Sequence, residues 1–322
     1  MEITVTGANA MTYPVLNIWN WVVSVYLFLV ATAAGLLVMS TLAVFRGRDL
    51  PPGHRQDILA AAGLVPLLLL LGILTIWLEL NVRQNFYWLF LSLSFSSPMF
   101  WGAWGLSLTF ITSILYGLSL MTDDARTWLK FNFLKVLSLG LASHTRLLAR
   151  MCCFLGICIG LYTGLSLSVF VARPLWNSAV APLIFLASSM TTGAALFVIL
   201  SCKKPIQLFF TKALIWLIGA EIITIFLFFV GQLTSSPAKR QAVLPLISIN
   251  QDYFIVMVSF ILIGICIPLA LVLNLLRVNE DNSEGLSRRS LLRMKLSAYL
   301  VLAGGFIIRL GWVYLGQLAK LS

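Results

Sequence analysis

Charged residues are scarce in this chain. Only 10% of its 322 residues are Asp, Glu, Lys or Arg, whereas 60% are hydrophobic and the mean hydropathy is +0.97. This composition excludes an ordinary soluble domain. The net charge of +11 does not indicate nucleic acid as a partner, because the basic residues are scattered over short polar segments and form no continuous stripe.

Residues that bind metals and haem are also rare. The two histidines, His54 and His144, lie in basic, polar segments between the apolar runs. A b-type haem held between helices needs intramembrane ligands such as His, so we expect no haem. The five cysteines form no C-x-x-C arrangement, so we expect no metal site and no iron–sulfur cluster in this chain.

What the chain has in quantity is long apolar runs, eight of which can cross a membrane as helices. We predict an all-α integral membrane protein, one domain over residues 1–322. The predicted spans cover residues 18–42, 58–80, 99–120, 151–172, 180–201, 213–232, 251–276 and 296–316. The segment before the first run lacks a basic n-region, so we expect that run to be retained rather than cleaved as a signal peptide.

The basic residues predict the orientation. Sixteen of the 22 Lys and Arg residues fall in the segments after the first, third, fifth and seventh spans. By the positive-inside rule these segments face the cytoplasm, so both termini are predicted to be periplasmic, in the bacterial cytoplasmic (inner) membrane. Between the third and fourth spans, basic and apolar residues alternate from Thr122 to Ala149, which predicts an interfacial helix.

Two similar segments suggest an internal organisation. Residues 28–35, FLVATAAG, lie in the first span, and residues 185–193, FLASSMTTG, lie in the fifth. Since both spans run in the same direction, one interpretation is a duplicated four-helix unit that gives two four-helix bundles. The other interpretation is convergent use of small residues where helices approach closely.

Four ionisable residues lie inside the predicted spans or at their ends: Glu79, Glu221, Asp252 and Arg309. A charge at the centre of a membrane helix costs about 2.5–3.5 kcal/mol, so each of these residues needs a partner or a function. The structural alternatives are an ion pair of Arg309 with Glu79 or Glu221, and capping of the seventh span by Asp252.

The alternating directions of the spans place most of these residues at one depth. The residues predicted in the outer half of the membrane are Glu79, Asp252, Arg309, Tyr26, Trp101 and Tyr162, whereas Glu221 lies deeper. A quinone site needs such a layer, because phenol groups can donate to the quinone carbonyls and a carboxylate can relay the protons. The alternative for the tyrosines is a role as packing or interfacial aromatics.

Several motifs occur in one order along the chain. They are YLFLVATAAGLL at 26–37, WLEL at 77–80, SSPMFWGAW at 96–104, YTG at 162–164, RPLWN at 173–177, P-x-x-F-x-x-S-x-x-x-T-G-A-A at 182–195, and GGFIIR followed by YLGQ at 304–317. Together they resemble the NrfD/polysulfide reductase membrane-subunit family. Members of that family oxidise or reduce membrane quinones beside a separate iron–sulfur subunit.

The resemblance implies a quinone such as menaquinone as the substrate. It implies that the YTG motif and the outer half of the first span form the quinone pocket. The candidate quinone contacts are Tyr162, Thr163, Tyr26, Asn20 and Trp101. Tyr26 stands where some members of the family have His, and this departure leaves the type of quinone open.

The candidate proton-relay residues are Glu221, Glu79, Asp252 and Arg309. The resemblance further implies a ferredoxin-like iron–sulfur subunit at the periplasmic face, with a molybdopterin oxidoreductase or a multihaem cytochrome subunit beyond it. The chain is then the quinone-reacting subunit of a respiratory oxidoreductase complex.

Two other classes of membrane protein remain as alternatives. A secondary transporter or ion-translocating subunit typically has interrupted helices and inverted repeats, whereas the repeat suggested here is parallel. A purely structural membrane anchor predicts that substitutions at Glu221 and Tyr162 are tolerated.

Overall fold

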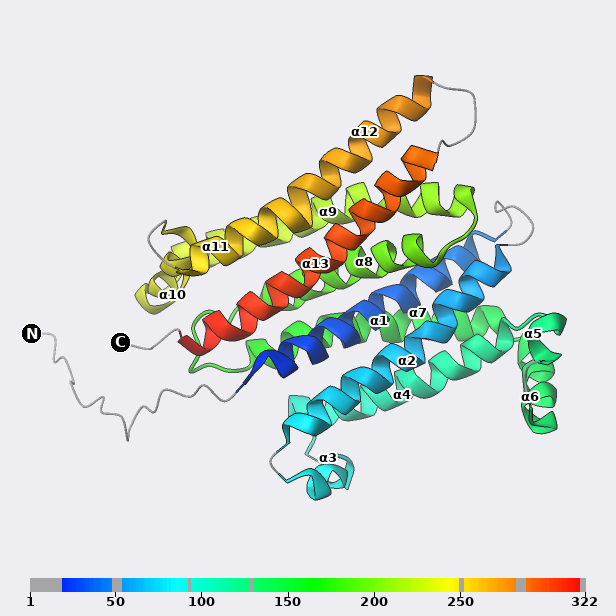
Figure 1. Ribbon diagram of the computed structural model, residues 1–322. Helices are drawn as coiled ribbons and strands as arrows, with labels where there is room; N and C mark the ends of the chain where they lie inside the picture. The colour runs from blue at the N-terminus through cyan, green and yellow to red at the C-terminus, as the bar shows by residue number, and fades with distance from the viewer. Residues whose placement is uncertain are drawn as a thin grey trace, which may run out of the picture.

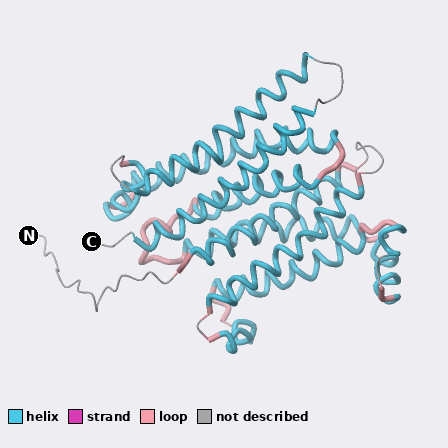
Figure 2. The backbone as a smooth tube through the Cα atoms, in the orientation of Figure 1, coloured by secondary structure: helices cyan, strands magenta, loops and turns pink. Residues whose placement is uncertain are grey.

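The computed structural model describes residues 19–47, 54–80, 82–91, 94–127, 130–248, 252–281 and 288–318. Within these ranges the chain is helical and contains no strand (Figure 2). Eight helical stretches are long and apolar enough to cross a membrane, which confirms the eight predicted spans. They are α1 (Trp21–Phe45), α2 (Arg55–Glu79), α4 (Pro98–Ser119), α7 (Thr145–Ser168), α8 (Ala181–Leu200), α9 (Lys204–Thr234), the continuous run of α11 (Asp252–Ser259), η2 (Phe260–Cys266) and α12 (Ile267–Asp281), and α13 (Arg288–Leu318).

Two spans are longer than the sequence predicts. Helices α9 and α13 have 31 residues each, whereas the predicted spans began at residues 213 and 296. A helix of that length extends about 46 Å, well beyond a hydrocarbon core of about 30 Å. The extra turns lie at the basic ends, where Lys and Arg side chains keep their charges in water while the backbone remains helical.

The spans form two groups of four (Figure 1). Helices α1, α2, α4 and α7 make the first bundle, and α8, α9, α11–α12 and α13 make the second. The bundles meet where α1 and α8 lie side by side. The start of α1 and the end of α13 lie at the same end of the molecule, which we call the terminal face; we call the opposite end the basic face.

Glycines allow the two bundles to approach. A Cβ atom on Gly193 of α8 would lie 2.1 Å from the carbonyl carbon of Gly35 in α1, so neither position has room for a side chain. These glycines belong to the two similar segments found in the sequence. Each segment is therefore in the first helix of its bundle, and the two segments also contact each other through small residues.

Five short helical segments connect the spans: η1 (Arg83–Tyr87), α3 (Trp88–Leu91), α5 (Asp123–Thr127), α6 (Asn132–Ala142) and α10 (Pro237–Ile247). Helix α6 lies within the segment that predicted an interfacial helix. Its outward side carries exposed Phe133, Val136 and Leu139.

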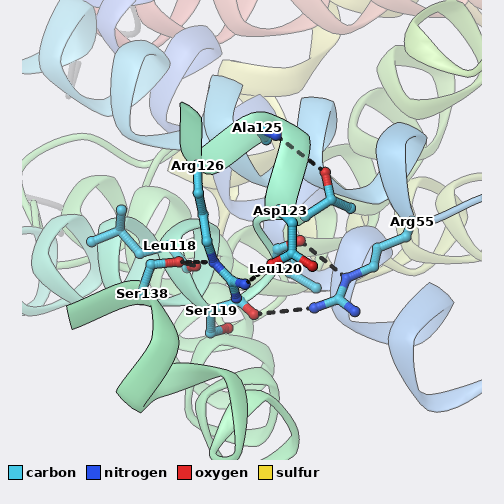
Figure 3. A network of polar contacts seen from close by, with 9 residues as sticks. Arg55, Leu118, Ser119, Leu120, Asp123, Ala125, Arg126 and Ser138 are labelled. Atoms are coloured by element: carbon cyan, nitrogen blue, oxygen red, sulfur yellow. Dashed lines mark hydrogen bonds and ion pairs between the residues drawn. The ribbon is translucent and has the colours of Figure 1, made fainter. Parts of the chain in front are cut away.

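Polar contacts at the basic face hold α5 and α6 to the end of α4 (Figure 3). Arg126 Nε donates to Ser138 Oγ at 3.1 Å, and the Ser138 hydroxyl donates to the Leu118 carbonyl at 2.7 Å. Arg55, at the start of α2, donates from Nε to the Leu120 carbonyl at 3.1 Å. These arginines and the serine satisfy carbonyl groups that have no partner inside α4, because they lie in its last turn.

Candidate functional site

A fully buried arginine lies where the two bundles meet. Arg309 of α13 has no exposed surface, and its Nη1 donates to Ser188 Oγ of α8 at 3.1 Å and to the Gly305 carbonyl at 2.6 Å. The rings of Phe28 and Phe185 lie 5.9 and 5.8 Å from the guanidinium carbon. These contacts suit a desolvated cation, because aromatic faces attract positive charge.

Gly305 creates the space for this guanidinium. A Cβ atom there would lie 2.3 Å from the Thr192 methyl group and 3.3 Å from Arg309 Nη1. The second glycine of the GGFIIR motif therefore explains how the arginine of the same motif fits between α13 and α8.

The carboxyl group of Glu221 lies on the other side of Ser188. Glu221 of α9 is 4% exposed, and the Thr191 hydroxyl of α8 donates to its Oε2 at 2.9 Å. The Ser188 hydroxyl also interacts with this carboxyl group. Arg309 and Glu221 are thus connected through a hydroxyl, and in the described part of the chain they form no direct ion pair.

Some polar atoms of this cluster remain unpartnered. Among the described residues, nothing accepts from Arg309 Nε or Nη2, and the buried Thr32 hydroxyl of α1 has no hydrogen-bond partner either. Buried polar atoms in proteins are normally satisfied by protein groups or by ordered water. The cluster therefore has hydrogen-bonding capacity beyond that used by its own side chains.

The two candidate tyrosines are neighbours in the first bundle. Tyr26 of α1 and Tyr162 of α7 are half-buried and interact with each other. Tyr162 reaches α4, since a Cβ atom on Gly102 would lie 1.9 Å from its hydroxyl oxygen. The YTG motif and the SPMFWGAW motif thus meet at one phenol group, between α1, α4 and α7.

The other candidates of this set are placed differently. The Thr163 hydroxyl is buried and donates to the Gly160 carbonyl of its own helix at 2.8 Å. Trp101 is 58% exposed on the outside of α4, where its Nε1 donates to the Phe95 carbonyl at 2.8 Å. The structure therefore brings Tyr26 and Tyr162 together but leaves Trp101 on the lipid-facing side.

Glu79 and Asn20 meet at the terminal face. Asn20 Nδ2 donates to Glu79 Oε1 at 3.3 Å, between the start of α1 and the end of α2. Asn20 is exposed and Glu79 is half-buried, so this carboxyl group is accessible to solvent. Six residues separate Asn20 from Tyr26 along α1, a rise of about 9 Å. Asp252 is the first residue of α11, and its side chain lies outside the described residues.

The RPLWN segment fastens the terminal face. Trp176 Nε1 donates to the Trp312 carbonyl of α13 at 2.8 Å, and Arg173 donates to the carbonyl of Gln317. The Gln317 side-chain amide exchanges two hydrogen bonds with the Trp19 backbone, each 2.9 Å long. The segment thus joins the start of α1 to the end of α13.

Ser188 and Thr191 were not among the site residues predicted from the sequence. The signal that points to them is a run of hydroxyl residues one turn apart in an otherwise apolar span. Their role depends on which face of α8 meets α9 and α13. Among the described residues, no three His, Cys, Asp or Glu side chains lie close enough together to hold a metal ion.

Comparisons with known proteins place these observations in a family. The family model described as "Polysulphide reductase, NrfD" matches residues 7–319. The C subunit of polysulfide reductase from Wolinella succinogenes is 30% identical over 177 residues, which cover 55% of this chain and 56% of that relative. The present protein thus spans just over half the length of that relative.

Two further relatives carry the family name. Protein NrfD of Escherichia coli is 30% identical over 241 residues, covering 70% of this chain and 74% of the relative. The Protein NrfD homolog of Haemophilus influenzae is 25% identical over 193 residues, covering 57% and 59%. Together with the eight apolar helices, these matches make the protein a multi-pass membrane protein. It belongs to the polysulphide reductase NrfD family, membrane subunits of respiratory oxidoreductase complexes.

Proposed function

We propose that this protein is the quinone-reacting subunit of a respiratory oxidoreductase in the bacterial cytoplasmic membrane. The observation that carries the proposal is the pair of neighbouring phenol groups, Tyr26 and Tyr162, between α1, α4 and α7. A quinone has an apolar ring and two carbonyl oxygens, so it suits a half-buried membrane site with hydroxyl donors. Tyr162 donates to one carbonyl and Tyr26 supports it.

The route from lipid to this pair passes α4. Trp101 lies on the lipid-facing side of α4, one residue before the Gly102 that contacts Tyr162. In the proposal Trp101 lines the route by which the ring enters. Thr163 fixes the local backbone of α7 through its hydrogen bond to Gly160, and Asn20 orients the Glu79 carboxyl group above the ring.

Quinone reduction consumes two electrons and two protons, and quinol oxidation releases them. We assign proton exchange with the terminal-face solvent to Glu79, because it is half-buried and hydrogen-bonded to Asn20. The Glu221, Ser188 and Arg309 cluster is the second proton-relay group, on the second bundle's side of α1. Asp252, at the start of α11, is a third candidate at the terminal face.

The electrons pass to or from a partner at the terminal face. We propose a ferredoxin-like iron–sulfur subunit there, with a molybdopterin oxidoreductase or multihaem cytochrome subunit beyond it. The name of the Wolinella relative marks it as one lettered part of polysulfide reductase, which supports a complex of several subunits. The basic residues at the opposite ends of the helices support a periplasmic terminal face.

The test compares Tyr162→Phe with Tyr299→Phe. Tyr299 is 56% exposed on α13 and serves as a matched control for loss of one phenol hydroxyl. Tyr162→Phe should lower quinol-dependent reduction of the partner clusters in membranes about tenfold, since loss of one hydrogen bond of about 1.4 kcal/mol is one decade. Complex assembly should be unchanged. Equal turnover of both variants and the unmodified protein would assign Tyr162 to a structural role and support the membrane-anchor alternative.

A further inference from the structure

An apolar cleft lies in the second bundle, away from the tyrosine pair. It has an empty volume of about 470 Å³, which includes its open side. Its walls come from Ile225 and Phe228 of α9, Val256 of α11, Phe260 of η2, and Ile308 and Trp312 of α13. No titratable residue lines it, so a charged or strongly hydrated ligand would not fill it.

The helix geometry changes where the cleft is lined. The π-helical segment η2 begins at Phe260 and ends directly before α12, whose second residue is Pro268. Proline has no backbone N–H, so the preceding turn cannot keep an unbroken α-helical ladder, and the π turn accommodates the break. On the facing helix, Gly311 lines the cleft with no side chain, and a Cβ atom there would lie 2.9 Å from Val256 Cγ1.

Two buried polar atoms at this cleft have no protein partner. Trp312 is 8% exposed, and among the described residues nothing accepts from its indole N–H. Gln232 of α9 is 1% exposed and follows Phe228 by one helical turn, and its Oε1 receives no hydrogen bond from the described part of the chain. A buried indole donor without an acceptor calls for a ligand that carries an oxygen atom next to its apolar part.

Basic residues lie at the terminal-face end of the cleft. Helix α10 turns Ala242, Val243 and Leu246 inward, and Leu246 lines the cleft. Lys239 precedes Val243 by one turn and so lies on the same side of α10, where it is half-buried. Arg240 is held beside it by a hydrogen bond from its Nε to the Leu233 carbonyl at the end of α9, 3.1 Å long.

We propose that this cleft binds an anionic phospholipid from the terminal-face leaflet. One acyl chain lies along α13 between Leu315 and Ile308, a distance of about 10 Å at 1.5 Å per residue. An ester carbonyl oxygen accepts from the Trp312 indole N–H. The phosphate lies at Lys239 and Arg240, whose charges complement it. The lipid fills the space between the helices of the second bundle and joins α10 to α9 and α13.

The test measures lipid retained by the full-length protein purified in mild detergent, by native mass spectrometry with added phosphatidylglycerol or phosphatidylethanolamine. The double variant Lys239→Gln/Arg240→Gln should bind phosphatidylglycerol about tenfold more weakly. Lys212→Gln, an exposed lysine at the other end of α9, is the matched control and should bind it as the unmodified protein does.

A second pair of variants tests the acyl chain. Val256→Phe fills the cleft and should remove most of the retained lipid, whereas Ile223→Phe adds the same ring on the exposed side of α9 and should not. Trp312→Phe keeps the shape and removes only the N–H, so it should weaken retention even if the larger substitution disturbs the fold. Equal retention by the unmodified protein, Trp312→Phe and the double variant would overturn the proposal. So would displacement of a co-purified quinone, rather than a phospholipid, by Val256→Phe.

Discussion

Replacing Ser188 by Ala tests whether the hydroxyl between Arg309 and Glu221 transmits protons or only holds the bundles together. The change removes the 3.1 Å contact from Arg309 Nη1 and leaves the 2.6 Å contact to the Gly305 carbonyl. Arg309 already has two unpartnered nitrogens among the described residues, so it would then keep a single acceptor for its buried charge.

The size of the effect follows from the kind of contact removed. A hydrogen bond between membrane helices contributes on average about 0.6 kcal/mol and up to about 1.7 kcal/mol, and a charged donor places this one at the upper end. We therefore expect the free energy of unfolding to fall by about 1–2 kcal/mol. Quinol-dependent turnover should fall about tenfold, because the connection between the two charged groups is interrupted.

Ser189→Ala is the matched control. Ser189 is adjacent, equally buried, and its hydroxyl donates to the Phe185 carbonyl of its own helix at 2.6 Å, without reaching either charged residue. Turnover would be measured in membranes that contain the partner subunits, and stability by denaturant titration of the purified protein. If Ser188→Ala and Ser189→Ala gave the same turnover, Ser188 would not be part of a proton route.

Three further outcomes are expected. Glu221→Gln keeps an acceptor for Thr191 but cannot titrate, so turnover should fall on the order of 10²-fold with unchanged assembly; normal turnover would exclude Glu221 from the relay. Gly193→Ala places a Cβ 2.1 Å from the backbone of α1 and should destabilise the protein by about 1–3 kcal/mol in thermal unfolding, whereas Gly219→Ala, with open space around it, should not. A reporter that works only in the periplasm should be active when fused after Ser322; activity of a cytoplasmic reporter there would invert the orientation.

The sequence predicted the spans well because an apolar run long enough to cross a membrane has few other folds available. It placed the helix ends less well. Pro205 can occupy the first turn of α9, so that helix begins at Lys204 although the apolar run begins later. Hydropathy follows the lipid boundary, whereas backbone hydrogen bonding continues past it.

The site was predicted by residue type but not by arrangement. Glu221 and Arg309 stood out as charges in apolar spans, yet the bridging role of Ser188 depends on the rotation of α8 between α9 and α13. Asn20 and Glu79 were chosen for different roles and turn out to bind each other. Neither result was accessible from a single sequence, because helix rotation and pairing are set by contacts between distant segments.

The fastening of Trp19 to Gln317 has a consequence for biogenesis. These residues are 298 positions apart, so the contact that anchors the first span is made by nearly the last residues to leave the ribosome. The first bundle can insert and associate early, but its terminal end stays unfastened until α13 has crossed the membrane. The end that carries Asn20 and Glu79 is therefore completed last, and loss of a few C-terminal residues would disturb a site built mainly from the first half of the chain.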